Sequence, residues 1–495
     1  MMLNGRSIFH KADMDSPSRL LQVRRSLGLP QELIDVILEF LWNDQEALQQ
    51  CCLSSRSFRP LCQRYIFECV RMNPISGKRS EKEHTSDNPH QTPKIHVGDS
   101  HTPTMAQRLE DILKSSPGLA LLIRDLRICN VDESDWESSF GWLEKDTSLP
   151  FILPHLVNLE RFYLSGSLTD DSRVKMTSLP KPVQEALFTT WKSPKLTHIG
   201  IHCVIFATFH DLTSVLLHSI AVRDITLCFV DVDVDDLDGN DLNTAGVVAA
   251  LNGDVIEGKS DVLAPSTIIR APTIDSLALF AEPEVLSHLC SWLLSPTSNL
   301  PLSALRKLHL PVGLPDDLPF FHQILKASPS LEELHVTMLS WIESAPREPA
   351  DISSLKVVRL AIDLGEDDDG VLPTSHHPTL RWWCDNLTSS RSLALTDFHI
   401  YLLTDYDELI DTGWESQPEW KRLDGILSSL KRSVNLKIQI MEDEPEIGNR
   451  AKSLKPLEQQ FSRMGDLGRL EVGYMQAKEI FCHFGVHWVQ EPFNS

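Results

Sequence analysis

A short apolar pattern recurs along this chain and limits the folds that it can adopt. The pattern is L-x-x-L-x-L, with Ile, Val or Phe also allowed, and nine instances of it form a series along the chain. The apolar triplets begin at Ile123, Leu159, Leu196, Val222, Ile274, Leu305, Leu331, Leu355 and Leu395. Because alternate residues of a β-strand point to the same face, each instance predicts a short strand with one apolar side. Such a strand cannot cover its own apolar side, so neighbouring units must stack.

Helix-like runs that end at Ser-Pro precede several of these strands. Pro117, Pro194, Pro296 and Pro329 mark such ends. Proline cannot continue a helix, and it pushes the residue before it into extended geometry. The sequence therefore predicts a helix–strand unit that recurs from about residue 105 onward.

The spacing of the strands indicates the class of repeat. Several spacings lie in or near the roughly 20–29 residues of leucine-rich repeats. The spacing between Val222 and Ile274 is 52 residues, twice the 26 found elsewhere, so one repeat there is degenerate or absorbed in an insertion. The predicted fold class is α/β: an irregular leucine-rich-repeat solenoid with parallel strands on its concave face and helices outside. An ordinary α/β domain with Leu-rich strands is the alternative.

A different pattern occupies residues 29–72, where three short helices are expected. Pro30 suits the first position of a helix, and Glu32 lies in its first turn. One apolar strip follows helical spacing, and a second strip lies beside it. The first strip is Leu33, Val36, Ile37, Phe40 and Leu41, and the second is Ile34 and Leu38. A helix that is apolar over more than one face is expected to bury one of them against another protein.

Two further helices and two polar segments complete the predicted domain organisation. Asn43 or Asp44 can cap the second helix, and Ser54 or Ser55 the third. Residues 1–28 are expected to be a loose leader. Residues 73–104, rich in Pro, Ser, His and Thr, are expected to be a linker or a surface excursion, and residues 105–495 the repeat domain.

Charge and cysteine content restrict the partners and the compartment. The chain of 495 residues has a formal net charge of −23, of which residues 1–82 contribute +3 and the remainder −26. Nucleic acid is therefore not expected as a partner, whereas a basic protein target remains possible. The ten cysteines form no disulfide or zinc pattern, and the N-terminus has no secretory segment, so a cytoplasmic or nuclear protein is expected. The most membrane-like stretch, from Ile199, contains Asp211 and is interpreted as a strand, a loop and a helix.

Few motifs indicate chemistry, and no cofactor, metal or catalytic residue is predicted. Gly253 to Ser260, GDVIEGKS, matches the phosphate-loop pattern, but Glu257 would place negative charge there and Pro265 would stop the helix. Acidic runs begin at Asp231, Glu366 and Glu442 and are expected to be loops; the first does not fit a calcium-binding loop, because Asp236 stands where Gly is needed. The histidines of FCHFGVH, starting at Phe481, are interpreted as packed side chains.

The stretch LPQELIDVILEFLWNDQEALQQCCLSSRSFRPLCQRYIF, from Leu29 to Phe67, resembles an F-box. That motif begins Leu-Pro-x-Glu, continues with an aliphatic helix, and ends with an Arg-x-Trp/Phe step and a final aromatic residue. The matching positions are Leu29, Pro30, Glu32, Leu33, Ile37, Leu38, Leu41, Leu48, Arg56, Phe58 and Phe67. Phe58 stands where Trp is commoner, and Cys51 and Cys52 surround a site that is usually Val or Cys. The rest of the chain looks like the degenerate leucine-rich arrays that often follow an F-box, a combination numerous in fungi.

The resemblance implies a receptor rather than an enzyme. F-boxes dock on the small adaptor of the Skp–cullin–F-box (SCF) ubiquitin ligase, and the repeats then bind a protein substrate. The adaptor-binding residues expected are Leu29, Pro30, Glu32, Leu33, Ile34, Ile37, Leu38, Leu41, Leu48, Arg56 and Phe58. Two alternatives remain: an F-box scaffold that acts outside ubiquitination, and a nucleotide-binding enzyme that uses Gly253–Ser260.

Overall fold

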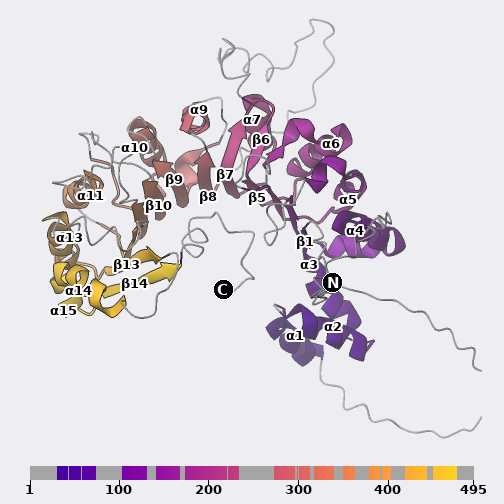
Figure 1. The fold of residues 1–495 in the computed structure, drawn as a ribbon, viewed down its shortest axis with the longest axis horizontal. Helices are drawn as coiled ribbons and strands as arrows, with labels where there is room; N and C mark the ends of the chain where they lie inside the picture. Colours follow the sequence, from indigo (N-terminus) through magenta and orange to yellow (C-terminus); the bar gives the residue numbers. More distant parts are fainter. Residues whose placement is uncertain are drawn as a thin grey trace, which may run out of the picture. The chain divides into compact units, whose positions relative to one another are not determined.

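The computed structural model divides the chain into two compact units, Met1–Tyr65 and Ile66–Ser495 (Figure 1). It describes residues 31–42, 44–56, 58–73, 103–130, 141–167, 173–219, 221–233, 273–281, 283–295, 298, 300–312, 317–338, 349–362, 378–390, 393–402, 418–442 and 450–476. The expected leader, most of the expected linker and the phosphate-loop match lie outside these ranges. The acidic run from Glu366 and the histidines of FCHFGVH also lie outside them.

The first unit is built from short helices, as expected. They are α1 (Gln31–Phe40), α2 (Gln45–Ser54) and α3 (Arg59–Glu68), whose last turn continues into the second unit. Asp44 caps α2, because its side chain accepts a hydrogen bond from the backbone N–H of Ala47 at 2.8 Å. Leu38, Leu48 and Cys62 form the buried interior, one residue from each helix.

The second unit is α/β, and its described residues form an open 14-stranded parallel sheet. The main path of the sheet is β1 (Cys69–Met72), β2 (Asp125–Cys129), β3 (Arg161–Ser165), β5 (His198–His202), β7 (Asp224–Val232), β8 (Ser276–Ala281), β9 (Lys307–Val312), β10 (Glu333–Met338), β11 (Val357–Ile362), β12 (Asp397–Leu402), β13 (Asn435–Glu442) and β14 (Leu470–Gln476). Off this path, β4 (Val174–Lys175) pairs with β6 (Val204–Phe206), which pairs with the end of β7. Strands adjacent along the path follow one another in the sequence, an order compatible with a solenoid-like fold.

One register runs through the sheet. Leu126, Phe162 and Ile199 are paired neighbours, and the same position recurs in the strands that follow. At the start of most strands, two successive backbone N–H groups donate to one carbonyl of the preceding strand. The N–H groups of Glu160 and Arg161, for example, both donate to the carbonyl of Arg124, at 2.8 and 2.9 Å. These repeated hydrogen bonds fix the register of neighbouring strands, so side chains at equivalent positions form rows across the sheet.

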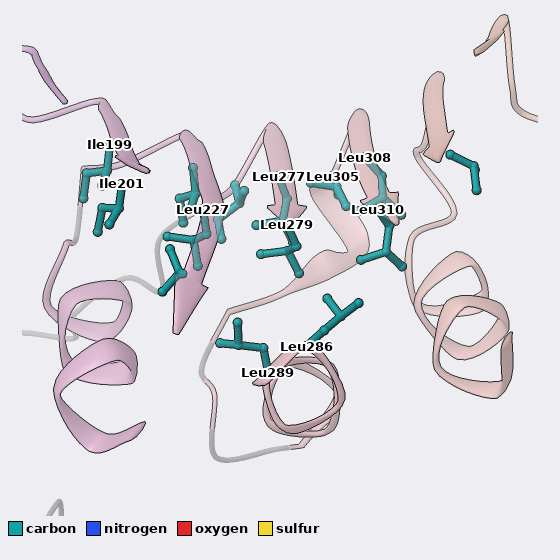
Figure 2. Close-up of a cluster of buried hydrophobic side chains, with 14 of the residues drawn as sticks. Ile199, Ile201, Leu227, Leu277, Leu279, Leu286, Leu289, Leu305, Leu308 and Leu310 are labelled. Atoms are coloured by element: carbon teal, nitrogen blue, oxygen red, sulfur yellow. The ribbon is translucent and has the colours of Figure 1, made fainter. Parts of the chain in front are cut away.

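Helices cover the apolar face of the sheet. They are α4 (Met105–Ser115), α5 (Leu149–His155), α6 (Lys181–Trp191), α7 (Phe209–His218), α9 (Pro283–Leu294), α10 (Asp317–Ala327), α11 (Pro378–Ser389), α13 (Pro418–Ser429), α14 (Arg450–Gln460) and α15 (Ser462–Asp466). Figure 2 shows Leu286 and Leu289 of α9 facing Leu277 and Leu279 of β8. These residues belong to one continuous apolar core. The other side of the strands, whose side chains alternate with the core positions, is called the polar face below.

The predicted strand pattern is confirmed. Every residue of the nine apolar triplets is buried, and the last two residues of each triplet lie in a strand. The helices α4, α6 and α10 end just before the Ser-Pro steps at Pro117, Pro194 and Pro329, as expected. The stretch from Ile199 forms a strand and a helix, as expected, but the short strand β6 (Val204–Phe206) lies between them, where a loop was expected. In the part of the chain that the structure describes, no helix is both long and apolar enough to cross a bilayer.

For the 52-residue spacing, two alternatives were open, and β7 pairs directly with β8, so no further strand of the sheet lies between them. Two further expectations differ from the structure. The first unit was expected to extend to residue 72, but β1 pairs with β2 and the chain divides after Tyr65. Asp231 and Glu442, expected in loops, belong to β7 and β13 because the ladder continues through them.

Candidate functional site

An exposed apolar strip on α1 is the first candidate site. Phe40 is 84% exposed and Leu33 50%, while Val36 and Ile37 are each 47% exposed. These four residues follow the i, i+3, i+4, i+7 spacing, so they lie along one side of the helix. Exposed contiguous apolar surface of this kind marks interaction sites.

The described helices of the first unit do not cover this strip. Each of the three short helices contributes one buried apolar residue, Leu38, Leu48 and Cys62. Leu38 is 2% exposed and lies on the opposite side of α1 from the strip. Because a helix can turn only one side to a single interior, the second apolar side of α1 stays exposed.

The residues expected to bind an adaptor fall into distinct groups. Leu33 and Ile37 lie in the exposed strip, and Arg56 is also exposed. Ile34, Leu41 and Phe58 are half-buried. Leu38 and Leu48 are buried, so they support the helices and do not lie on the surface. Leu29 and Pro30 lie outside the described residues, and Glu32 lies in α1.

Four exposed apolar residues were missing from the expected site: Val36, Phe40, Trp42 and Leu53. Val36 and Phe40 follow the helical spacing of Leu33, so the periodicity alone could have included them. Leu53, at 77% exposure on α2, gives no comparable signal. A surface position at the end of a helix is set by the packing of the helices, which one sequence does not specify.

The buried thiol of the first unit is not activated. Burial raises the pKa of the Cys62 thiol, and the neighbouring Cys51 and Cys52 raise it further. A thiol with a raised pKa remains protonated and is a poor nucleophile. Within the described ranges, the cysteines are not joined by disulfides.

A buried ion cluster lies on the polar face at β2 and β3. Asp125 is completely buried, and its carboxylate lies 3.3 Å from Arg127 Nη2 and 3.2 Å from Arg161 Nε. The Arg127 guanidinium stacks over the Tyr163 ring, 5.0 Å from its centroid. Gly200, on the next strand, leaves the space in which that ring lies, because a Cβ atom there would be 2.2 Å from Tyr163 Cδ1. Asp125 is thus the anion that two guanidinium groups share.

Histidines and an arginine form the second group on the polar face. His309, His335, Arg359 and His399 occupy equivalent positions on β9 to β12. Arg359 contacts His335 through a short hydrogen bond between Nη1 and Nε2. Burial, followed by the positive charge of Arg359, lowers the pKa of His309 to about 3 and that of His399 to about 4. These imidazoles are therefore neutral at physiological pH and act as hydrogen-bonding groups rather than as cations.

The described residues offer surfaces for binding rather than a metal centre. Among them, no group of three or more His, Cys, Asp or Glu side chains is placed to hold a metal ion. The phosphate-loop match at Gly253–Ser260 and the cluster of Cys482, His483 and His487 lie outside the described ranges and stay untested. What the described geometry supplies is an exposed apolar helix face and a polar sheet face.

No protein-family model matches the chain, and no curated protein matches it.

Proposed function

We propose that this chain is the substrate-recognition subunit of an SCF-type ubiquitin ligase. In this proposal, the stretch from Leu29 to Phe67 acts as an F-box that docks on a Skp-type adaptor, which is bound to a cullin. The parallel-sheet unit acts as an irregular leucine-rich-repeat array that holds a protein target. The chain itself breaks and forms no bond; it contributes by bringing the target close to the ubiquitin-charged enzyme.

The exposed strip on α1 is the observation that carries the proposal. Leu33, Val36, Ile37 and Phe40 form an apolar side of α1 that is exposed beside the described helices of the first unit. A stable protein interface buries about 800 Å² on each partner and depends on a few apolar anchors near its centre. The strip supplies anchors of the right type, and its helix belongs to the stretch that resembles an F-box.

The architecture of the second unit supports the receptor role in the proposal. A long parallel sheet presents many short strands, and alternate side chains of each strand lie on the polar face. Such a surface can differ at every strand without disturbing the apolar core beneath it, because core and surface positions alternate. The repeated register thus suits recognition of a protein segment.

Affinity purification of the full-length chain with mass spectrometry tests the proposal. The expected result is that both a Skp-type adaptor and a cullin co-purify. Recovery of the adaptor without a cullin would favour the alternative of a scaffold outside ubiquitination. Absence of both would remove the proposed function, and a nucleotide-binding assay on wild type and Lys259→Ala would then address the enzymatic alternative.

A further inference from the structure

At the start of β9, β10 and β11, positively charged side chains outnumber negatively charged ones. Two carboxylates, Glu332 and Glu333, lie at the start of β10, and cations from both neighbouring strands surround them. We define the cationic patch as Arg306, Lys307, Glu332, Glu333, Lys356 and Arg359. It contains four cations and two carboxylates, a surplus of two positive charges.

Each carboxylate of the cationic patch is shared by two cations. Glu332 lies 2.8 Å from Arg306 Nη2 and 3.0 Å from Lys356 Nζ. Glu333 lies 3.1 Å from Lys307 Nζ and 3.8 Å from Arg359 Nη1. One carboxylate cannot neutralise two cations, so each trio keeps one positive charge.

The neighbouring carboxylates reduce this surplus but do not remove it. Asp275, on the β8 side, pairs with Arg223 at 3.8 Å, and its charge also acts on Arg306. Asp397, on the β12 side, accepts hydrogen bonds from two neutral groups, Thr396 Oγ1 at 2.7 Å and Asn435 Nδ2 at 3.0 Å, and so keeps its negative charge. With Arg223, Asp275 and Asp397 included, five cations stand against four carboxylates, a surplus of one. The net positive potential is also felt by His335, whose pKa is lowered first by burial and then by His309, Arg359 and Lys307.

The cations of the cationic patch are accessible. The side chains of Arg306, Lys307 and Lys356 are 59%, 58% and 51% exposed, and that of Arg359 is 25% exposed. The three strands span roughly 10 Å, because neighbouring strands are about 4.8 Å apart. An extended peptide covers this distance with about three residues. The dimensions therefore suit a short segment with two or three carboxylates.

We propose that the cationic patch binds a short acidic segment of the protein target, whose carboxylates supply the counter-charge that Arg306, Lys307, Lys356 and Arg359 lack. This inference rests on the proposed receptor role and specifies its target. It differs from the expectation drawn from the net charge of −23, which favours a basic target. At physiological salt, charges are screened beyond about 8 Å, so the local surplus governs contacts at the cationic patch. The acidic remainder of the chain disfavours a long polyanion such as nucleic acid.

Binding of labelled peptides to the purified full-length chain tests this inference. The probes are a fluorescein-labelled oligoglutamate peptide and a matched oligolysine peptide, measured by fluorescence anisotropy at low and high salt. The double variant Arg306→Gln/Lys356→Gln should weaken oligoglutamate binding by about fivefold, since each exposed charge pair contributes about 0.5 kcal/mol. Arg223→Gln is the matched control, because Arg223 is 65% exposed, lies outside the cationic patch and pairs with Asp275 at the equivalent position. It should bind like wild type.

Two single variants keep the test decisive if the double variant is unstable. Lys307→Gln and Lys356→Gln each leave one cation on the carboxylate, so both should fold, and each should weaken binding about twofold. The inference is overturned if oligolysine or an oligonucleotide binds in preference to oligoglutamate, or if the cationic-patch variants bind as Arg223→Gln does. No adaptor is present in this assay, so such a failure leaves adaptor docking untouched, and loss of adaptor docking leaves this result untouched.

Discussion

Replacement of Gly200 by Ala tests how the polar face is packed. A Cβ atom at Gly200 would lie 2.2 Å from Tyr163 Cδ1 and 2.8 Å from Cε1, distances that real Cβ contacts do not show. The Tyr163 ring is 7% exposed, and the Arg127 guanidinium lies over it, so the ring cannot move away freely. Arg127 is in turn held by Asp125. The substitution therefore has to displace a connected group of side chains.

The expected cost of Gly200→Ala is about 1–2 kcal/mol in the free energy of unfolding. Overpacking a filled site costs typically about 1–3 kcal/mol, and Gly→Ala recovers about 0.4–1 kcal/mol from the reduced entropy of the unfolded chain. Urea-induced unfolding followed by tryptophan fluorescence measures this difference. Gly473→Ala is the matched control, because Gly473 also lies in a strand and a Cβ atom there would have no neighbour within 4 Å. It should be neutral or slightly stabilising.

A double-mutant cycle isolates the clash between the two residues. Tyr163→Ala removes the ring, so adding Gly200→Ala to that variant should cost at least about 1 kcal/mol less than it costs in the wild type. Strict additivity of the two substitutions, or a Gly200→Ala variant as stable as Gly473→Ala, would refute the packing described for the polar face.

Two further predictions concern buried charge and buried histidine. Asp125→Asn should lower the free energy of unfolding by about 3 kcal/mol in urea titrations, because it removes the buried anion beside Arg127. Glu160→Gln, in an exposed pair with Arg124, should change it by less than about 1 kcal/mol. Equal effects of the two substitutions would contradict the burial of Asp125. The pKa of His309 is lowered to about 3 in the folded chain, so the unfolded chain binds more protons than the folded chain between about pH 6.5 and about pH 3. The free energy of unfolding should therefore fall on acidification in this window, by up to roughly 1.4 kcal/mol per pH unit. Urea midpoints from about pH 7 to about pH 5 should fall less steeply in His309→Asn, and parallel slopes would show that His309 is not the group responsible.

The sheet could be predicted from the sequence because its signal is local and repeated. In each triplet, the last two apolar residues lie two positions apart, as in Leu277 and Leu279, and the same spacing recurs in every strand. Three strands of the main path were missed, two of them for a physical reason. β1, β13 and β14 lie at or near the ends of the sheet; in β1 and β13 the triplet is incomplete, because Met72 and Ser433 occupy apolar-triplet positions, whereas β14 has a full triplet, Leu467, Leu470 and Val472, that was overlooked.

The candidate sites were predicted less completely, because they depend on contacts between distant residues. Periodicity indicated that α1 has two apolar sides, but the packing of α2 and α3 decides that Leu38 is buried and Phe40 exposed. The cationic patch requires the register of three strands. Lys307 and Glu333 each lie two positions after the start of their triplets, so their pairing follows only once consecutive triplets are known to be adjacent and in register. Net charge averages over such local arrangements and therefore cannot reveal them.

Titration of a purified Skp-type adaptor with the full-length chain tests the central proposal most directly. Leu33→Ser/Phe40→Ser removes two anchors of the exposed strip at side chains that are 50% and 84% exposed, so the fold should be retained. Val157→Ser, at a valine that is 53% exposed in the second unit, is the control for loss of an exposed apolar side chain. The account predicts tight binding by wild type and by Val157→Ser, and a loss of at least about 2 kcal/mol, or about 30-fold, in the double variant. Equal binding by all three proteins, or no binding by wild type, would contradict it.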